Sequence, residues 1–395
     1  MHNLLEYRKQ SFFIKNILLV LMIIYLAGCG SNQDSEQFEL TIIRVPSDYL
    51  TIQGAIDNSK DTDIIVINNG TYYENLTIEY KQITLTSNYY FSKDKNDINS
   101  TTIDGSGNTV ITIDTNSTNT SINGLTIQNG NDGISPHSKV NITNNIIKNN
   151  IDGIDYEGGG GTCLNNTIIN NVDDAIDLDG SVEVKIENNN LSYNGDDGIE
   201  IRLHPHEGTT LIIDIINNKI THNKEDGIQL IGYNELTKRK FKIYRNLITD
   251  ISMSAIGFMD NQNTIEDYSG ASLNEETIIS NNTFVNNNYC VTGGSNSLII
   301  NNVFLSTINS TIKNVLNGSL IHNNLYWNNG LNLDNSNFDS SFINYDPLLN
   351  TDYSLMQTSP AIDIGINSIE WNNYNFSIVE NYNGTTSDIG FLEYE

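Results

Sequence analysis

The chain has 395 residues, of which 48 are acidic and 20 basic, and its net charge is −28. This acidity argues against nucleic-acid binding, which needs lysine and arginine to displace counterions from phosphates. Charged residues make up only 17% of the chain and hydrophobic residues 38%, and the hydrophobic residues recur in order, so a disordered chain is also excluded.

The first 28 residues are expected to be a targeting segment. Basic residues precede the apolar run ILLVLMIIYL at residues 17–26, which is short for a membrane-spanning helix. The stretch LAGC that follows resembles the lipobox of bacterial lipoproteins. The resemblance implies cleavage before Cys29, lipidation of that cysteine, anchoring to a membrane, and a place in the outer membrane or on the cell surface. A generic signal peptide or an uncleaved anchor is the alternative.

The rest of the chain repeats with a period of about 22 residues. Short runs such as VNITNNI alternate apolar and polar residues, which favours strands over helices. A period of this length predicts a solenoid. Asparagine tolerates tight left-handed turns and can stack from coil to coil, so the sequence predicts an all-β, single-stranded parallel β-helix. The recurring pairs of asparagine, or close variants of the pair, lie at Asn145, Asn166, Asn189, Asn218, Asn246, Asn282, Asn302 and Asn324.

Both ends of this region resemble known β-helix proteins. VPSDYLTIQGAIDNSKDTDIIVINNGTYYENLTI, residues 45–78, is similar to the opening of right-handed parallel β-helix proteins, among them pectinesterase-like and copper-protein-maturation-like families. The resemblance implies a right-handed helix whose first coil is plugged by a short helix at Thr51–Ser59. SPAIDIG and SDIGFLEYE are similar to the ending of bacterial surface β-helix proteins. The predicted order is signal peptide, polar tether, β-helix and C-terminal capping segment, at residues 1–28, 29–40, 41–345 and 346–395.

A second motif, of which DDGIEIRLH is one copy, recurs once in each coil. The copies can be aligned on their isoleucine, and side chains alternate between the two sides of a strand. With the isoleucine inside, the residue two positions later also points inward and forms an apolar column: Pro136, Tyr156, Leu178, Ile201, Leu230 and Phe258. Two columns then point outward: Ser135, Asp155, Asp177, Glu200, Gln229 and Gly257, and beside them His137, Glu157, Asp179, Arg202, Ile231 and Met259. The aspartates two residues before each isoleucine are expected to have a structural role in the turns: Asp132, Asp152, Asp174, Asp197 and Asp226.

The outward columns bring carboxylates to the strand spacing of ~4.8 Å. Such crowding raises the pKa values of carboxylates or requires a cation. We therefore expect a Ca²⁺ site, because this ion prefers oxygen ligands, formed by Asp155, Asp177, Asp179 and Glu200. The alternative is a solvated acidic face, on which water and salt screen the repulsion.

Three consecutive repeats are lengthened after this motif, at HPHEGTT, GYNELTKRK and DNQNTIEDYSGASLNEE. Insertions on one side of a solenoid often build its binding face. The middle insertion begins a basic cluster, Lys238, Arg239, Lys240 and Lys242, which is expected to bind carboxylates or sulfates of a substrate. A solvated loop is the alternative.

The stretch GISPH, residues 133–137, is similar to the G-[FI]-D-P-H motif of C5-epimerases, with Ser135 where that family has aspartate. Together with the acidic groove, this resemblance implies a uronate lyase or epimerase acting as a monomer on an anionic polysaccharide. Arg202 is then the base or the group that neutralises the substrate carboxylate, and His137 or His204 is the acid.

Several other interpretations stay open. Acid pairs at strand spacing also suit glycoside hydrolysis, although the polygalacturonase and pectinesterase signatures are missing. A non-catalytic glycan-binding or adhesive surface protein needs no catalytic group. Metal (copper) handling through His204 and His206 would need a third ligand. Cys163 and Cys290 are expected to be separate buried thiols, since several coils lie between them.

Overall fold

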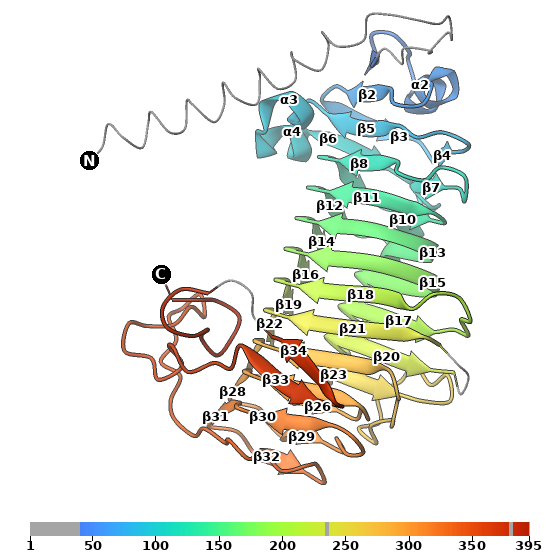
Figure 1. Ribbon diagram of the computed structural model, residues 1–395. Helices are drawn as coiled ribbons and strands as arrows, with labels where there is room; N and C mark the ends of the chain where they lie inside the picture. Colours follow the sequence, from blue (N-terminus) through green and yellow to red (C-terminus); the bar gives the residue numbers. More distant parts are fainter. Residues whose placement is uncertain (1–39, 234–236, 379–381, 395) are drawn as a thin grey trace, which may run out of the picture. The chain divides into compact units, whose positions relative to one another are not determined.

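The structure, a computed structural model, describes residues 40–233, 237–378 and 382–394. The predicted signal peptide, Cys29 and the tether up to residue 39 lie outside the described residues. No helix in the described ranges combines the length and hydrophobicity needed to cross a membrane. From Leu40 onward the chain winds into a stack of parallel strands with three faces (Figure 1). The predicted all-β parallel β-helix is confirmed.

The first face carries the recurring isoleucine motif and is called the D-G-I face below. Its strands pair in parallel, coil upon coil. They are β4 (Leu76–Ile78), β7 (Ile111–Ile113), β10 (Asp132–Pro136), β13 (Asp152–Leu164), β15 (Ile176–Glu187), β17 (Ile199–Leu203), β20 (Ile228–Gly232), β23 (Ser254–Met259), β26 (Tyr289–Thr292), β29 (Ser310–Lys313) and β32 (Leu331–Asp334).

The second face joins the D-G-I face in one 21-stranded sheet, because β13 and β15 run through both. Its other strands are β1 (Ile42–Val45), β2 (Ile64–Ile67), β5 (Thr84–Ser87), β8 (Ser121–Asn123), β11 (Lys139–Thr143), β18 (Leu211–Ile216), β21 (Arg239–Tyr244), β24 (Glu276–Ser280), β27 (Ser297–Ile300) and β30 (Leu320–His322).

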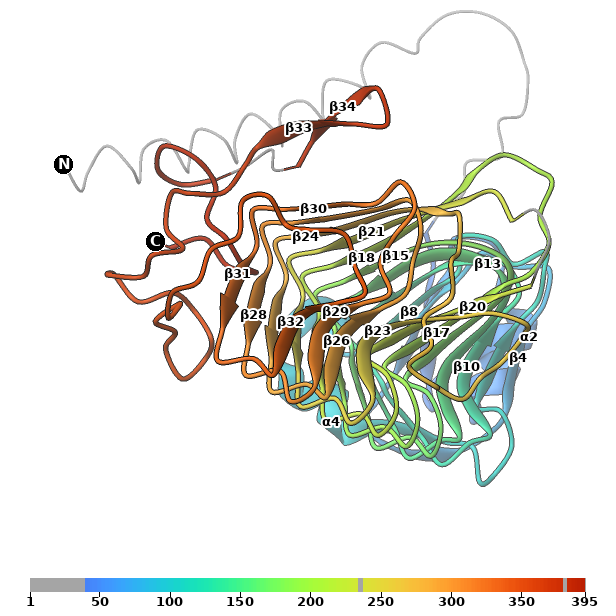
Figure 2. The same cartoon turned by 90° about the horizontal axis from the view of Figure 1, so that it is seen from below.

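The third face is an 11-stranded sheet of short parallel strands. Its strands are β3 (Gly70–Tyr73), β6 (Thr101–Asp104), β9 (Thr126–Gln128), β12 (Ile146–Lys148), β14 (Thr167–Ile169), β16 (Asn190–Ser192), β19 (Lys219–Thr221), β22 (Leu247–Thr249), β25 (Thr283–Val285), β28 (Val303–Leu305) and β31 (Leu325–Trp327). Figure 2 looks along the stack and shows the three faces around the core.

The interior is apolar, and a ladder of asparagines lines one of its corners. The inward column predicted for the D-G-I face is buried, with Tyr156 at 0% and Phe258 at 1% exposure. Asparagines stack at the corner between the second and third faces, where Asn145 Nδ2 donates to Asn166 Oδ1 at 3.1 Å and the pattern repeats in later coils. This ladder satisfies buried corner groups that would otherwise cost about 1–3 kcal/mol each. Cys163 and Cys290 are both buried and unbridged, as expected.

Short helices cover the start of the stack and part of one side. Helix α2 (Ile52–Asn58) is capped by the Thr51 side chain and buries Ile52, Ala55 and Ile56 in the first coil, which confirms the predicted capping helix. Helices α3 (Tyr89–Ser92) and α4 (Lys95–Ser100) form an excursion beside the third face, where Thr126 Oγ1 donates to Ile98 O.

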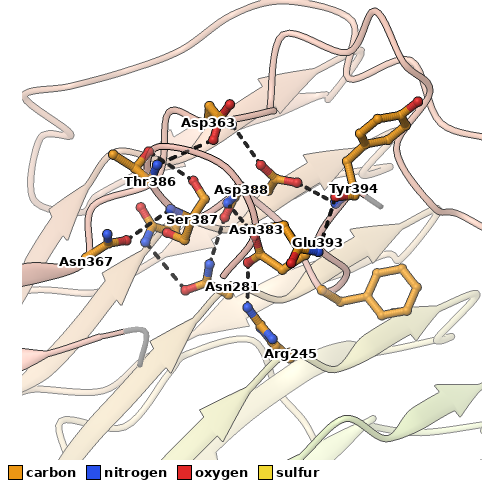
Figure 3. Close-up of polar contacts among 12 residues, drawn as sticks. Arg245, Asn281, Asp363, Asn367, Asn383, Thr386, Ser387, Asp388, Glu393 and Tyr394 are labelled. Atoms are coloured by element: carbon orange, nitrogen blue, oxygen red, sulfur yellow. Dashed lines mark hydrogen bonds and ion pairs between the residues drawn. The ribbon is translucent and has the colours of Figure 1, made fainter. Parts of the chain in front are cut away.

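The segment from residue 346 onward folds back along earlier coils. It includes the antiparallel hairpin of β33 (Ser368–Trp371) and β34 (Tyr374–Ser377). Its last residues are held by an ion pair between Arg245 and Glu393, 2.5 Å between Nη2 and Oε1, and by Asn281 Nδ2, which donates to Asp388 O at 2.9 Å (Figure 3).

Candidate active site on the D-G-I face

The register of the outward columns agrees with the sequence prediction. Asp155 pairs with Asp177, Asp177 with Glu200, and Glu200 with Gln229, each one coil further along the stack. Gly257 continues the column after Gln229. The side chains thus lie in a row across adjacent strands, because the buried isoleucines fix which residues face outward.

The first outward column is not a solvated face. Asp177 is 7% exposed, Glu200 3% and Gln229 0%, so the alternative of a screened, water-exposed row is wrong for these residues. The reason is that Arg202, in the second column, folds back over Asp177 and Glu200. Desolvated carboxylates need a partner, and here the nearest cation comes from the same face.

Arg202 contacts three carboxylates from two adjacent strands. Its Nη1 lies 2.9 Å from Asp177 Oδ2 and 3.2 Å from Asp179 Oδ2, and its Nη2 pairs with Glu200 Oε1. The arginine side chain is 28% exposed, so the cluster can be reached from solvent. One guanidinium faces three acids, which leaves an excess of negative charge at neutral pH if all are ionised.

Three acids of the first outward column hold their protons unusually tightly. Burial, reinforced by Glu200, raises the pKa of Asp177 to about 8. Burial also raises the pKa of Glu200 to about 7, against the opposing effect of Arg202, and that of Asp155 to about 7, with Glu157 adding to the shift. Such groups change charge near neutrality, where acid–base chemistry and cation binding both operate.

The surroundings of Arg202 favour a fixed positive charge over a base. Burial alone would lower its pKa, but Asp177, Glu200 and Asp179 more than offset that effect and hold the pKa above its ordinary value. The guanidinium keeps its proton throughout the accessible pH range. Of the two roles expected from the sequence, only that of a fixed positive charge agrees with this environment.

The oxygens of this cluster can hold a metal ion. Asp174, Asp177 and Glu200 each offer a carboxylate oxygen within 4.8 Å of the others, and all three are buried. Oδ1 of Asp177 and Oδ1 of Asp155 are buried and accept no hydrogen bond. Orphaned oxygens in an all-oxygen donor set fit Ca²⁺. Asp174 also accepts the main-chain N–H of Asp197 at 2.8 Å, the turn role expected for it.

Two of the four predicted ligands lie outside this group, and Asp174 belongs to it instead. Asp179 points to Arg202 and His204, and Asp155 lies one coil before Asp177; neither belongs to the group of three. Asp174 was not predicted as a ligand, because its position before the isoleucine indicated a turn residue. Asp174 can serve both in the turn and beside the ligand group, because the corner turns its carboxyl toward the outward column.

The histidines separate into different environments. His204 Nε2 lies 3.3 Å from Asp179 Oδ1, and its ring packs at 4.4 Å from the ring of Tyr233. Both nitrogens of His206 lie near other groups, Nδ1 at 2.9 Å from Ser181 Oγ and Nε2 at 2.9 Å from Thr209 O. His206 is thus held away from a shared site with His204, contrary to the copper interpretation. The metal-binding groups found among the described residues contain carboxylates only.

His137 lies too far away to act with Arg202. It follows β10, three strands before β17, which corresponds to about 14 Å at the usual strand spacing. Its Nε2 is 3.4 Å from Ser135 Oγ. The expectation that either histidine could be the partner acid narrows to His204, because only this side chain contacts the cluster.

The four residues of the predicted basic cluster also lie in different environments. Lys238 and Lys240 line a pocket of about 610 Å³ together with Tyr233, next to the stacked His204. Lys238 Nζ donates to Glu207 O at 2.6 Å, and Lys240 Nζ pairs with Glu276 at 2.9 Å. The pocket was expected from the insertions. Tyr233 was missed, although an aromatic residue directly after a motif strand was a usable signal.

Two of the predicted substrate-binding residues serve the fold. Arg239 is 4% exposed, and its guanidinium donates to the main-chain oxygens of His204 at 2.7 Å and Gly180 at 2.6 Å. It borders the same pocket, but its guanidinium is used to tie the insertions to the stack. Lys242 lies over the ring of Tyr244, 4.9 Å from its centre, and outside the pocket. Arg239 is buried on one side of β21 and Lys240 and Lys242 lie on the other, and the run of basic residues alone could not show which of them reaches the pocket.

No protein-family model matches the sequence, and no curated protein does. Solved structures do match. Pectate lyase Pel9A is 15% identical, with 90% of this chain and 96% of that chain covered and a TM-score of 0.59. The A-module of the Azotobacter vinelandii mannuronan C-5 epimerase AlgE4 is 14% identical, with 74% and 89% covered and a TM-score of 0.53. XylC in complex with xylose is 12% identical, with 83% and 88% covered and a TM-score of 0.51. The chain shares the right-handed parallel β-helix fold of these proteins.

Proposed function

We propose that the D-G-I face binds an anionic, uronate-containing polysaccharide and cleaves it by β-elimination. The observation that carries this proposal is the cluster in which Arg202 contacts Asp177, Asp179 and Glu200 beside the accessible His204. The pocket lined by Lys238 and its neighbours is the proposed place for adjoining sugar carboxylates. The protein is further proposed to be a lipid-anchored monomer of the cell envelope, which rests on the sequence alone.

The cluster is proposed to hold Ca²⁺ during the reaction. Asp174, Asp177 and Glu200 would hold the ion, and Asp155 on the preceding strand offers a further orphaned oxygen. When bound, the ion would neutralise the uronate carboxylate and so make the proton on the neighbouring carbon more acidic. An all-carboxylate donor set favours Ca²⁺ over copper.

His204 is the proposed base. Its Nε2 faces Asp179, so a proton on Nε2 is held there and Nδ1 is left to accept the proton from the carbon next to the carboxylate. The electron pair of that C–H bond forms a carbon–carbon double bond, and the glycosidic C–O bond on the next carbon breaks. Arg202 transfers no proton; it fixes the positions of the acids.

Tyr233 is the proposed proton donor to the leaving oxygen. Its ring stacks on His204, and its hydroxyl keeps its proton because burial, helped by Asp179, raises its pKa. The phenol proton passes to the glycosidic oxygen as the C–O bond breaks, and solvent then returns a proton to the phenolate. Base and acid thus lie on one side of the cluster.

The test is the absorbance of the unsaturated product during incubation with polygalacturonate, alginate and glycosaminoglycans, with Ca²⁺ or with chelator. We expect product from at least one polymer, none with chelator, and a fall in kcat of at least ~100-fold in His204→Gln. His322→Gln is the matched control, since His322 lies on β30 and contacts Ser340 instead. Retained polymer binding with neither unsaturated ends nor epimerised sugars in any sample would leave only a binding protein.

A further inference from the structure

A row of corner residues runs along the edge where the second face turns into the third. In successive coils each has a positive φ between 53° and 69°, a conformation that favours glycine and asparagine. The row, called the corner row below, comprises Gly124, Asn144, Asn165, Asn188, Asn217, Arg245, Asn281, Asn301 and Asn323. Its side chains point outward from the stack, beside the internal asparagine ladder.

The later half of the corner row binds the C-terminal segment. Asn281 Nδ2 donates to Asp388 O (Figure 3), and Asn323 Nδ2 donates to Ile364 O at 3.0 Å. Asn301 uses both ends of its amide, because Nδ2 donates to Ile366 O at 2.9 Å and Oδ1 accepts from Ile366 N at 3.0 Å. An asparagine in this row can therefore bind a group that offers a donor and an acceptor side by side.

Two asparagines in the earlier half of the row are open. Asn165 and Asn188 are exposed, and among the described residues their side chains make no hydrogen bond. They line a pocket of about 470 Å³ with Thr167, Asn190 and Lys95, called the asparagine pocket below. A pocket of this size suits a small or extended ligand. Figure 1 shows the pocket strands β12, β14 and β16 between the α3–α4 excursion and the C-terminal segment.

Helix α3 closes one end of the asparagine pocket. The ring of Tyr89 lies against Gly124, the corner-row position at which the other coils carry a side chain. A Cβ at Gly124 would lie only 2.6 Å from Tyr89 Cδ1, so the glycine is required for this wall. The pocket is thus a built feature, formed by the excursion together with three consecutive coils.

The lining points to an uncharged, hydroxyl-rich ligand. Seven of its twelve residues are asparagine, of which Asn145 and Asn166 belong to the buried ladder, and none is acidic, in a chain whose net charge is −28. A carboxamide offers a donor beside an acceptor, which matches neighbouring hydroxyls of a sugar. Peptides that bind grooves use apolar anchors as well. Here only Ile98 and Ile146 are aliphatic, and Ile98 is 5% exposed.

We propose that the asparagine pocket binds an uncharged stretch of polysaccharide. The pocket lies at the corner between the second and third faces, whereas the Arg202 cluster lies on the D-G-I face. The pocket can therefore bind sugar whether or not that cluster is catalytic. It would hold a mixed or branched polymer against the stack while the acidic face binds the charged sugars.

The test uses Asn165→Gly combined with Asn188→Gly. Glycine removes both carboxamides and keeps the positive φ without strain, so the fold is retained. Asn149→Gly is the matched control, because Asn149 is exposed, has φ 58° and follows the far end of β12. The probes are uncharged hexasaccharides from xylan, β-glucan, mannan and galactan, followed by saturation-transfer NMR and calorimetry on the whole chain.

We expect at least one hexasaccharide to bind the wild type, with Kd raised about tenfold or more in the double variant. Binding should be unchanged in Asn149→Gly and in His204→Gln, which separates this site from the D-G-I face. Absence of binding by every hexasaccharide, or binding that survives the double substitution, overturns the proposal. The peptide AIDIGIN, residues 361–367, is the part of the C-terminal segment that binds the later half of the corner row. Selective binding of this peptide, and not of the sugars, also overturns the proposal.

Discussion

Glu266 occupies the space that Gly257 leaves free in the first outward column. A Cβ at Gly257 would collide with the carboxyl oxygens of Glu266 and Asp226. Glu266 comes from the third insertion, and its Oε2 accepts a hydrogen bond from Thr292 Oγ1 at 3.1 Å. The insertion thus reaches back into the D-G-I face and is fixed there.

Gly257→Ala is accordingly expected to dislodge the insertion. Overpacking of this kind costs about 1–3 kcal/mol of unfolding free energy. Chemical denaturation measures the loss. Hydrogen exchange should become faster at residues 260–275, while strand β13 keeps its protection. Equal exchange of the insertion in both proteins would show that Glu266 does not hold it.

The pKa values of the acidic cluster predict how stability depends on pH. Asp177 titrates at about 8 and Glu200 at about 7 in the folded chain, above the ordinary range near 4 that applies on unfolding. The folded state then binds more protons than the unfolded state between these values. Their contribution to stability is complete below pH ~4 and is lost as the pH rises to about 8. In chelator, Tm should fall from pH 5 to pH 8, and Ca²⁺ should restore it mainly at pH 8.

Asp177→Asn tests whether this one carboxyl links the loss of a proton to the binding of calcium. The amide cannot ionise, so the metal-free variant should lose less stability between pH 5 and pH 8 than the wild type. The rise of Tm with added Ca²⁺ should largely disappear, because a central oxygen ligand has lost its charge. Glu157→Gln is the control, since Glu157 is exposed on the neighbouring strand. An undiminished calcium response in Asp177→Asn contradicts the proposed ligand set.

Arg202→Met removes the cation and keeps much of the side-chain volume. Loss of one partner of a buried ion pair costs about 3–5 kcal/mol, and partial exposure of Arg202 places the expected loss toward the lower figure. The loss should be larger at pH 8 than at pH 5, because protonation of Asp177 and Glu200 at the lower pH relieves their repulsion. Urea titrations at the two pH values measure both losses, and equal losses would indicate that the acids stay protonated in either case.

Asn301→Gly tests the attachment of the C-terminal segment. Two hydrogen bonds to Ile366 disappear while the positive φ stays unstrained, and the expected loss is about 1–3 kcal/mol. Asn165→Gly removes an equivalent side chain from the earlier half of the corner row and should leave Tm unchanged. Hydrogen exchange at residues 361–367 distinguishes local release from global loss of stability.

The fold could be predicted because each coil repeats the same local choices. Ile176 and Leu178 alternate with Asp177, and a shift by one residue would turn Asp177 into the core. The strand register could therefore be predicted from the amino-acid sequence alone. The capping helix was placed by resemblance. Asn145 and its successors indicated the corners, because few other residues suit a left-handed turn beside a buried ladder.

The site could be predicted only where it depended on strand register. The row from Asp155 to Glu200 is a property of pairing, and it lies where the sequence predicted. The use of Arg239 inside the fold and the position of Glu266 beside Gly257 both depend on how the insertions fold back. That path is set by contacts between distant residues, and repeat alignment carries no information about it.

The attachment of the chain end to earlier coils has a mechanical consequence. In a solenoid each coil contacts only its neighbours, so unwinding can begin at either end. Here the ion pair between Arg245 and Glu393 joins residues 148 positions apart, and Asn281 and Asn301 add further links. The later coils must therefore separate together, whereas the earlier ones can peel away singly. A pull on this molecule would meet a graded resistance at its beginning and a single large step toward its end.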